Sequence, residues 1–481
     1  MVAENLSLHH HVGLRLYWVT QCILGVLLGL HALIYVVAPF KSIYPMLPVW
    51  AALGGFLVVF AVMSRLTLGR TQTQLEPPHL FGWLDGFTSD KLLIRLTLIS
   101  VVGLCFHVFA KYYLTHLRPV HCLFEIRFAW IEVPHSMLPW FVRIASVLGH
   151  LLTAFAYFGV FIASLMTIRT YEHTKQRWRH LIYLLVFMLI GTIYAGFIGS
   201  RNAMLAYLVM AFAGVVLGLC LQSFTWRKAL NAGVITCVLP FLMAAGFSTA
   251  VFSNRIFCDA NAAPIAQGVV QLPVEKNTQA VAAQYLLANC KAFAIECYQD
   301  GYGKTVLERF LLRCSTCGST MLYLEHGIIN FSQIVAAHSR GDPVLFRFFQ
   351  TLPTRFGLAY IDEDKNAPDS RVYGPGGTTF AGAAYHDYGI SGVLLSALVL
   401  GTIYGWMLRL INGKKALSLG VWLYVGCFYI LMTSNIFVGS NAMPFPFILF
   451  GSGITIAAVT MARNTRISAL CDLVRYRSRH G

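Results

Sequence analysis

Apolar residues gather in long runs along most of the chain, with short polar segments between the runs. Each run is roughly twenty residues long, which is the length of helix that crosses a hydrocarbon core of about 30 Å. The pattern therefore predicts an all-α, polytopic membrane protein. We expect about ten transmembrane helices, near residues 15–37, 46–63, 92–110, 141–168, 181–200, 203–222, 231–252, 389–410, 417–437 and 444–462.

One long stretch, from about Ser253 to Asp387, interrupts this pattern. Lysines and arginines recur along it with acidic residues between them, so it must lie in water or at the headgroup boundary. It divides the chain into a membrane part over 1–252 with about seven helices, a large loop over 253–387, and a membrane part over 388–481 with about three helices and a basic tail. Within the loop we predict helices around 279–297, 303–324 and 328–338.

The composition agrees with a membrane protein. The 481 residues are 57% hydrophobic and 12% charged, and the mean hydropathy is +0.64. These values exceed the apolar share of a soluble domain. The first apolar run has full length and lacks a small-residue cleavage site, so we expect an uncleaved anchor rather than a signal peptide.

The net charge of +16 bears on orientation rather than on nucleic-acid binding. Basic residues gather in short loops instead of covering one amphipathic face. The positive-inside rule then predicts cytoplasmic termini and an extracytoplasmic long loop. The loop residues that carry this prediction are Arg65, Arg70, Lys91, Arg169, Lys175, Arg177, Arg179, Arg227, Lys228, Lys414 and Lys415.

The turn Gly199-Ser200-Arg201-Asn202 separates two apolar runs on the side predicted to be outside. One interpretation is a helical hairpin whose Arg201 extends to the lipid headgroups. The other is an anion site, because a guanidinium makes paired hydrogen bonds to phosphate and keeps its charge at any depth. The start of a helix beside the turn adds backbone N–H donors to such a site.

Further candidates come late in the loop. Arg355 and Arg371 precede the glycine-rich Gly374–Gly377, which is either an ordinary solvated turn region or part of a diphosphate site shared with Arg201. Two guanidinium groups on one diphosphate would neutralise a leaving group whose charge grows in the transition state.

Ala384 to Gly389 marks the point where the loop re-enters the membrane, and it contains His386 and Asp387. Such a pair either forms a merely structural hydrogen bond or takes a proton from a sugar hydroxyl. Glu325-His326 is a second candidate base. The chain has no Walker A motif, no HExxH and no carboxylate pair at metal-binding spacing, so we expect neither a metal nor a cofactor.

These residues, taken together, resemble a known family, the bacterial oligosaccharide repeat-unit polymerases of the Wzy type, which make O-antigen and enterobacterial common antigen. The resemblance covers roughly residues 140–460 in element order. It is carried by Gly199-Ser200-Arg201, by Arg309 and Arg313 in the loop, and by Gly376-Gly377-Thr378-Thr379 through His386-Asp387-Tyr388-Gly389-Ile390-Ser391-Gly392. Some members carry an Arg, ten residues and then a Gly in outer loops. Arg371 and Gly382 match this spacing, whereas Arg201 has Phe212 at that position.

The resemblance implies a metal-independent glycosyltransferase of the bacterial inner membrane. A growing glycan on undecaprenyl diphosphate is moved onto a lipid-linked repeat unit outside the membrane, among membrane lipids and with a possible chain-length regulator as partner. Nucleic acid is not an expected partner. The implied diphosphate ligands are Arg201, Arg355, Arg371, Arg313 and Arg309, and the implied catalytic residues are His386, Asp387 and Arg371.

Two alternatives remain open at this point. O-antigen ligases share a hairpin arginine and a loop histidine near re-entry, so Arg201 and His386 fit that class as well. A transporter of an anionic solute or a lipid-linked glycan is the alternative from outside the enzymes. Transporters need ionisable groups or broken helices within the membrane. The spans carry few charges and the loop is too long for a simple connector, which favours the enzyme.

Overall fold

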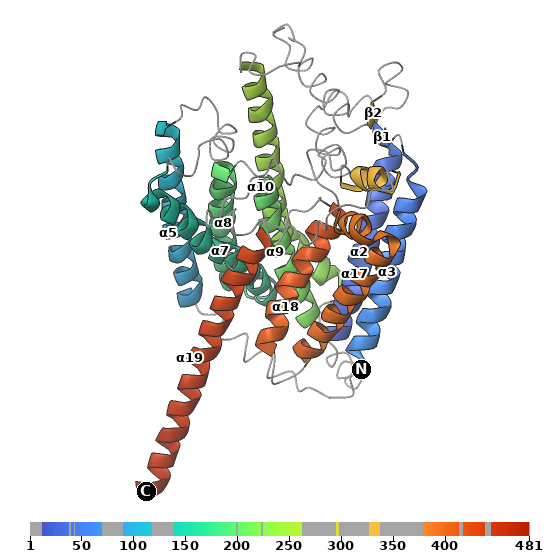
Figure 1. Cartoon of the computed structure of the whole chain (residues 1–481). Coiled ribbons are helices and arrows are strands. Elements are labelled where there is room, and N and C mark those ends of the chain that lie inside the picture. Colours follow the sequence, from blue (N-terminus) through green and yellow to red (C-terminus); the bar gives the residue numbers. More distant parts are fainter. Residues whose placement is uncertain are drawn as a thin grey trace.

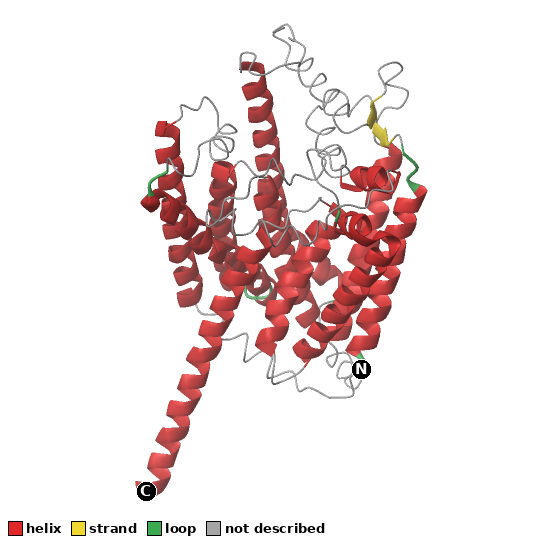
Figure 2. Ribbon diagram, viewed as in Figure 1, coloured by secondary structure: helices red, strands yellow, loops and turns green. Residues whose placement is uncertain are grey.

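The computed structural model describes residues 12–37, 40–42, 44–69, 90–117, 138–198, 201–222, 225–261, 295–297, 327–336, 379–412, 417–437 and 444–480. Long helices dominate this part of the chain (Figures 1 and 2). They are α2 (Val12–Val37), α3 (Leu47–Leu68), α5 (Asp90–Leu117), α7 (Trp140–Arg169), α8 (Thr174–Ile198), α9 (Arg201–Leu221), α10 (Trp226–Asn261), α17 (Phe380–Asn412), α18 (Leu417–Tyr429), the π-helix η2 (Ile430–Phe437) and α19 (Pro444–His480).

The chain is a multi-pass membrane protein of the all-α class, and the described part is helical apart from one pair of short strands. Nine of the described helices are long and apolar enough to cross a bilayer. The remaining predicted run, 417–437, is the α-helix α18 continued by the π-helix η2. Large apolar side chains are exposed on the outer faces of the bundle, among them Trp18, Val26 and Phe241. An outer face this rich in apolar side chains suits contact with lipid, and helices satisfy their own backbone polar groups there.

The two ends of the bundle differ. We call the end at which α10 ends and α17 begins the loop end, since the long polar stretch joins these helices. The opposite end is the tail end, beyond which α19 extends well past the other helices (Figure 1). α8 ends and α9 begins at the loop end, whereas α7 ends and α8 begins at the tail end.

The helix α7 is the centre of the bundle. In its most apolar window 89% of the residues are buried, the largest share of any span in the described part. Small residues let its neighbours approach closely: a Cβ added at Gly149 of α7 would lie 2.8 Å from the backbone nitrogen of His107 in α5, and one added at Gly451 of α19 would lie 2.6 Å from Ala154 O. Without a hydrophobic force between helices in lipid, such close packing holds spans together.

A second contact region joins α17 to α3. Gly401 and Gly405 form a G-x-x-x-G pattern, and both face the α3 backbone at Phe60 and Ser64. Between them, Tyr404 donates a hydrogen bond to Thr20 Oγ1 of α2 over 2.6 Å. The pattern therefore fixes α17 against the two N-terminal helices through small residues and one buried hydroxyl pair.

Parts of the long stretch are described, and they both confirm and correct the sequence analysis. A helix at Gly327–Ala336 confirms the prediction over 328–338. The helix predicted over 279–297 is wrong at its end, because Ile295–Cys297 forms strand β2, antiparallel to strand β1 (Phe40–Ser42). Pairing with a distant strand overrides a weak local helix preference here. The rest of 279–297 and the helix predicted over 303–324 lie outside the described residues.

Candidate functional site

The helix α17 begins nine residues before the apolar run that predicted it. Thr379 caps its start: Thr379 Oγ1 accepts a 2.9 Å hydrogen bond from Gly382 N, and Thr379 O accepts one from Ala383 N. A threonine in this role satisfies a backbone donor that the first helical turn leaves unpaired. At Gly389 the helix is broken, with φ 65° and ψ −153°. The segment 380–388 is thus a separate short helix at the loop end, leading into the span.

This short helix carries the two predicted catalytic side chains, His386 and Asp387. His386 Nδ1 lies 3.2 Å from Asp387 Oδ1, and the two side chains are 4% and 1% exposed. An ionised carboxylate accepts hydrogen bonds only, so Nδ1 carries the proton and the basic lone pair of the neutral ring is on Nε2. The pair can accept a proton at Nε2 while the carboxylate stabilises the resulting imidazolium.

A helix from the long polar stretch packs beside this pair. The ring of Phe331, in the Gly327–Ala336 helix, meets the ring of Tyr385 edge-on with centroids 5.5 Å apart. Ile328 and Phe331 are fully buried in the same core as the spans. In Figure 1 this helix, drawn in gold, lies next to the start of α17. The long stretch therefore contributes directly to the surroundings of the His386–Asp387 pair.

Of the predicted arginines, the structure describes only the backbone of Arg201. Arg201 is the first residue of α9, so its backbone begins a helix at the loop end, the same end as His386; its side chain lies outside the described part. Arg309, Arg313, Arg355 and Arg371 lie outside the described residues, as do Glu325 and His326. The structure thus brings His386 and Asp387 together, and the joint diphosphate site stays a prediction.

A buried polar cluster that the sequence analysis missed joins α5, α7 and α8. His150 Nδ1 and Tyr194 Oη are 2.6 Å apart. The His107 ring lies 4.8 Å from the His150 ring and 5.1 Å from the Tyr194 ring, measured between centroids. His107 is fully buried and neither of its ring nitrogens makes a hydrogen bond to any described residue. Lys111, one turn further along α5, is 6% exposed.

Such groups inside a membrane bundle are expensive, which makes them functional candidates. The signal in the sequence is the presence of His107 and His150 within two apolar runs. It does not reveal that the two rings meet, because that depends on how closely α5 and α7 cross at Gly149. The cluster lies in the half of the bundle nearer the loop end.

Among the described residues no group of three or more His, Cys, Asp or Glu side chains is placed to hold a metal ion. Comparison of the chain with protein-family models, with curated proteins and with solved structures finds no match in any of the three.

Proposed function

We propose that this protein is a membrane glycosyltransferase that polymerises oligosaccharide repeat units. It transfers a growing glycan from undecaprenyl diphosphate to a lipid-linked repeat unit on the outer side of the bacterial inner membrane. The observation that carries the proposal is the buried His386–Asp387 pair at the loop end, with a helix of the long polar stretch packed beside it. The same residues carry the resemblance to the repeat-unit polymerases.

The pair suits the chemistry of glycosyl transfer. An acceptor hydroxyl oxygen forms a bond to the anomeric carbon of the donor sugar, and the bond from that carbon to the diphosphate breaks. The acceptor gives its proton to His386 Nε2, since Nδ1 already donates to Asp387. Asp387 stabilises the imidazolium, as the aspartate of a Ser-His-Asp triad does. The departing undecaprenyl diphosphate keeps the bonding electron pair.

The arginines supply the charge that the leaving group needs. Arg201 begins α9 at the loop end, where the positive end of a helix favours an anion. Its guanidinium makes paired hydrogen bonds to one phosphate, and Arg371 with Arg355, Arg313 and Arg309 completes the neutralisation. A site of this kind needs no metal, and a chain-length regulator is the natural protein partner.

The distribution of basic loops supports the orientation that this function needs. Both termini are cytoplasmic and the long stretch faces outward, where flipped lipid-linked substrates lie. A reporter fused near Lys276 then reads as extracytoplasmic, and one fused after Asn412 reads as cytoplasmic. Finding Lys276 in the cytoplasm would remove the site from its substrates.

Arg201 provides the test of the proposal. A charge-assisted hydrogen bond contributes about 1.5–3 kcal/mol, so loss of the paired contact slows transfer by roughly ten- to a hundredfold or more. Arg201→Lys keeps the charge and loses the fork, so it fails nearly as badly as Arg201→Ala. Cells with either variant display single repeat units on the lipid anchor, while the protein still accumulates in the membrane.

Two other phenotypes decide between the alternatives. Long chains that accumulate on undecaprenyl diphosphate, with none on lipid A, identify a ligase instead. If glycan chain length and glycan attachment are unchanged in the variants, Arg201 does not bind the diphosphate. It is then a residue whose side chain extends to the lipid headgroups.

A transporter of an anionic solute or a lipid-linked glycan is a second candidate, and one observation favours it. His107, His150 and Lys111 are the kind of buried ionisable groups that transport pathways use. The discriminating measurement is uptake into vesicles. If the protein is a transporter, His107→Phe and His150→Phe abolish solute uptake. If it is a polymerase, the two variants and the wild type show the same uptake.

A further inference from the structure

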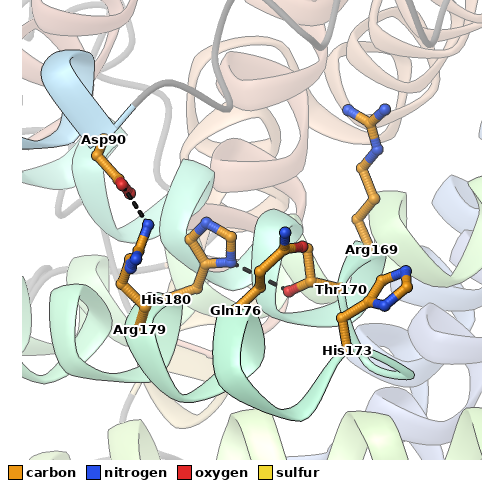
Figure 3. Close-up of a pocket in the computed structure, with 7 residues that line it drawn as sticks. All are labelled: Asp90, Arg169, Thr170, His173, Gln176, Arg179 and His180. Atoms are coloured by element: carbon orange, nitrogen blue, oxygen red, sulfur yellow. Dashed lines mark hydrogen bonds and ion pairs between the residues drawn. The ribbon is translucent and has the colours of Figure 1, made fainter.

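A pocket of about 400 Å³ opens at the tail end, far along the bundle from the His386–Asp387 pair. It lies where α5 begins, α7 ends and α8 begins. Seven residues line it: Asp90, Arg169, Thr170, His173, Gln176, Arg179 and His180 (Figure 3). Thr170, Gln176 and His180 occupy the middle, between the Asp90–Arg179 pair on one side and Arg169 with His173 on the other.

The turn between α7 and α8 is held in place by its own hydrogen bonds. His173 N donates to Thr170 O over 2.9 Å, and Arg177 Nη1 donates to Tyr171 O over 3.1 Å. The Arg177 guanidinium also lies over the Tyr171 ring, 5.0 Å from its centroid. Glu172 is tied to Lys228 of α10 by a 3.0 Å ion pair. The pocket walls are therefore positioned before any ligand arrives.

His180 gives the pocket a directed polar atom. Thr170 Oγ1 donates its single proton to Met166 O over 2.8 Å, so its 3.1 Å contact with His180 Nδ1 requires Nδ1 to be the donor. His180 is only 6% exposed, and its Nδ1 is held by Thr170. In Figure 3 the second ring nitrogen faces away from Thr170.

The charges of the lining favour an anion. Asp90 is the single carboxylate among the lining residues, against two guanidinium groups, and it already forms an ion pair with Arg179. α8 has no acidic residue in its first turn to neutralise the positive end of its dipole. The backbone donors of that turn add to the same preference.

We propose that this pocket binds an anionic phosphoryl group. The candidate span of α7 ends at Arg169 and that of α8 begins at Thr174, with basic residues on both sides of the turn, so the cavity lies at the depth of lipid headgroups. The phosphoryl group belongs either to a membrane phospholipid or to a soluble phosphate-bearing molecule. The site goes beyond the proposed glycosyl transfer, since it lies at the opposite end of the spans and needs no catalytic residue.

A matched pair of variants tests the site. Gln176→Glu places a carboxylate in the pocket with almost no change of shape, and Lys175→Gln makes the same change of net charge one residue outside it. Both positions are exposed, so both variants fold. Repulsion in place of a charge-assisted contact weakens binding at least about tenfold in Gln176→Glu only.

Two probes separate the sources of the phosphoryl group. In the first, native mass spectrometry measures retention of dioleoylphosphatidylglycerol from mixed micelles, with dioleoylglycerol as the phosphate-free control. In the second, thermal unfolding is followed with added inorganic phosphate against chloride at equal ionic strength. Selective loss of lipid retention in Gln176→Glu supports the lipid headgroup, and selective loss of the phosphate-induced rise in Tm supports a soluble ligand.

The proposal fails if the wild type binds neither probe. It also fails if Gln176→Glu and Lys175→Gln weaken binding equally, because the effect is then general surface charge. Neither measurement depends on glycosyl transfer. The proposed phosphoryl site and the proposed glycosyltransferase function can therefore be refuted independently of each other.

Discussion

The helices α7 and α17 are similar in length, 30 and 33 residues, yet they play different parts in the bundle. In α7, 89% of the most apolar window is buried and the helix is unbroken. In α17 the share is 39%, and the helix breaks at Gly389. The buried His386–Asp387 pair lies on the short segment before the break, on the helix that the bundle constrains less.

The difference indicates that α7 serves packing, whereas the start of α17 serves the candidate site. α7 is surrounded on all sides, so its neighbours must reach it through glycines and its sequence is limited by packing. α17 is fixed to α3 along one face by Gly401 and Gly405, and its first segment, before the break at Gly389, carries the His386–Asp387 pair at the loop end. We therefore expect changes in α7 to act on stability and changes at the start of α17 to act on activity.

Changes at His386 and Asp387 should have the largest effect. Positioned acid–base groups contribute about 10²–10⁴-fold to a rate. His386→Gln and Asp387→Asn should each slow glycan transfer by that order, measured as polymer formed from lipid-linked repeat units by purified protein. Tyr388→Phe, next along and 64% exposed, is the control and should stay near wild type. Full activity in both variants, with normal amounts of protein in the membrane, would mean that the pair is structural.

Gly214 of α9 tests the packing around α7. A Cβ there would collide with Phe161 O of α7, a backbone atom that cannot move aside. Overpacking of this kind costs about 1–3 kcal/mol, so Gly214→Ala should lower the free energy of unfolding by that amount, followed by thermal unfolding in detergent. Gly29→Ala in α2 is the matched control, because no atom of the described residues lies within 4 Å of its added Cβ. A stable Gly214→Ala would show that α7 is less tightly held than its burial indicates.

Substitution of Gly389 distinguishes an effect of backbone strain on stability from an effect of the helix break on activity. Its φ of 65° with ψ −153° belongs to a region that is essentially restricted to glycine, and an alanine there costs about 1–3 kcal/mol. Gly69, with φ 67° and ψ −173° after α3, is in a similar conformation, and at both positions an added Cβ would meet no described atom within 4 Å. Gly389→Ala and Gly69→Ala should therefore lose similar stability in thermal unfolding.

The two glycine variants should differ in activity. Gly389 follows Asp387 by two residues, so straightening the break there turns the His386–Asp387 pair away from its place, and transfer falls. Gly69→Ala leaves transfer intact. Equal activity in the two variants would show that the break does not position the pair.

Much of the fold follows from the apolar pattern, because helix length in a bilayer is set by thickness and composition alone. All ten predicted runs are helical. The start of α17 was missed because Ala381 to Asp387 is not an apolar run, and its helix depends on the Thr379 cap. Strand β2 was missed because its partner β1 lies some 250 residues earlier in the chain.

The candidate sites also divide into those formed by sequence neighbours, which could be predicted, and those formed by helix packing, which could not. His386 and Asp387 could be predicted because they are neighbours in the sequence and their position marks re-entry. The His107–His150 contact could not, since it depends on the crossing of α5 and α7. The basic residues of the α7–α8 turn were interpreted as orientation signals only. That Arg169, Arg179 and two histidines surround one cavity emerges only when α5 brings Asp90 beside them.

The smallest effect is expected at the tail end of α7, in the Glu172–Lys228 ion pair. Its atoms are 3.0 Å apart, but the two side chains are 63% and 56% exposed. Exposed pairs contribute about 0–1 kcal/mol and are screened by salt. Lys228→Ala should thus change the unfolding temperature little at low ionic strength and not at all in high salt. A loss of stability in Lys228→Ala comparable with that in Gly214→Ala would show that the α7–α8 turn helps to hold the bundle together. The expectation that stability depends on the buried contacts of α7 and not on its exposed end would then be wrong.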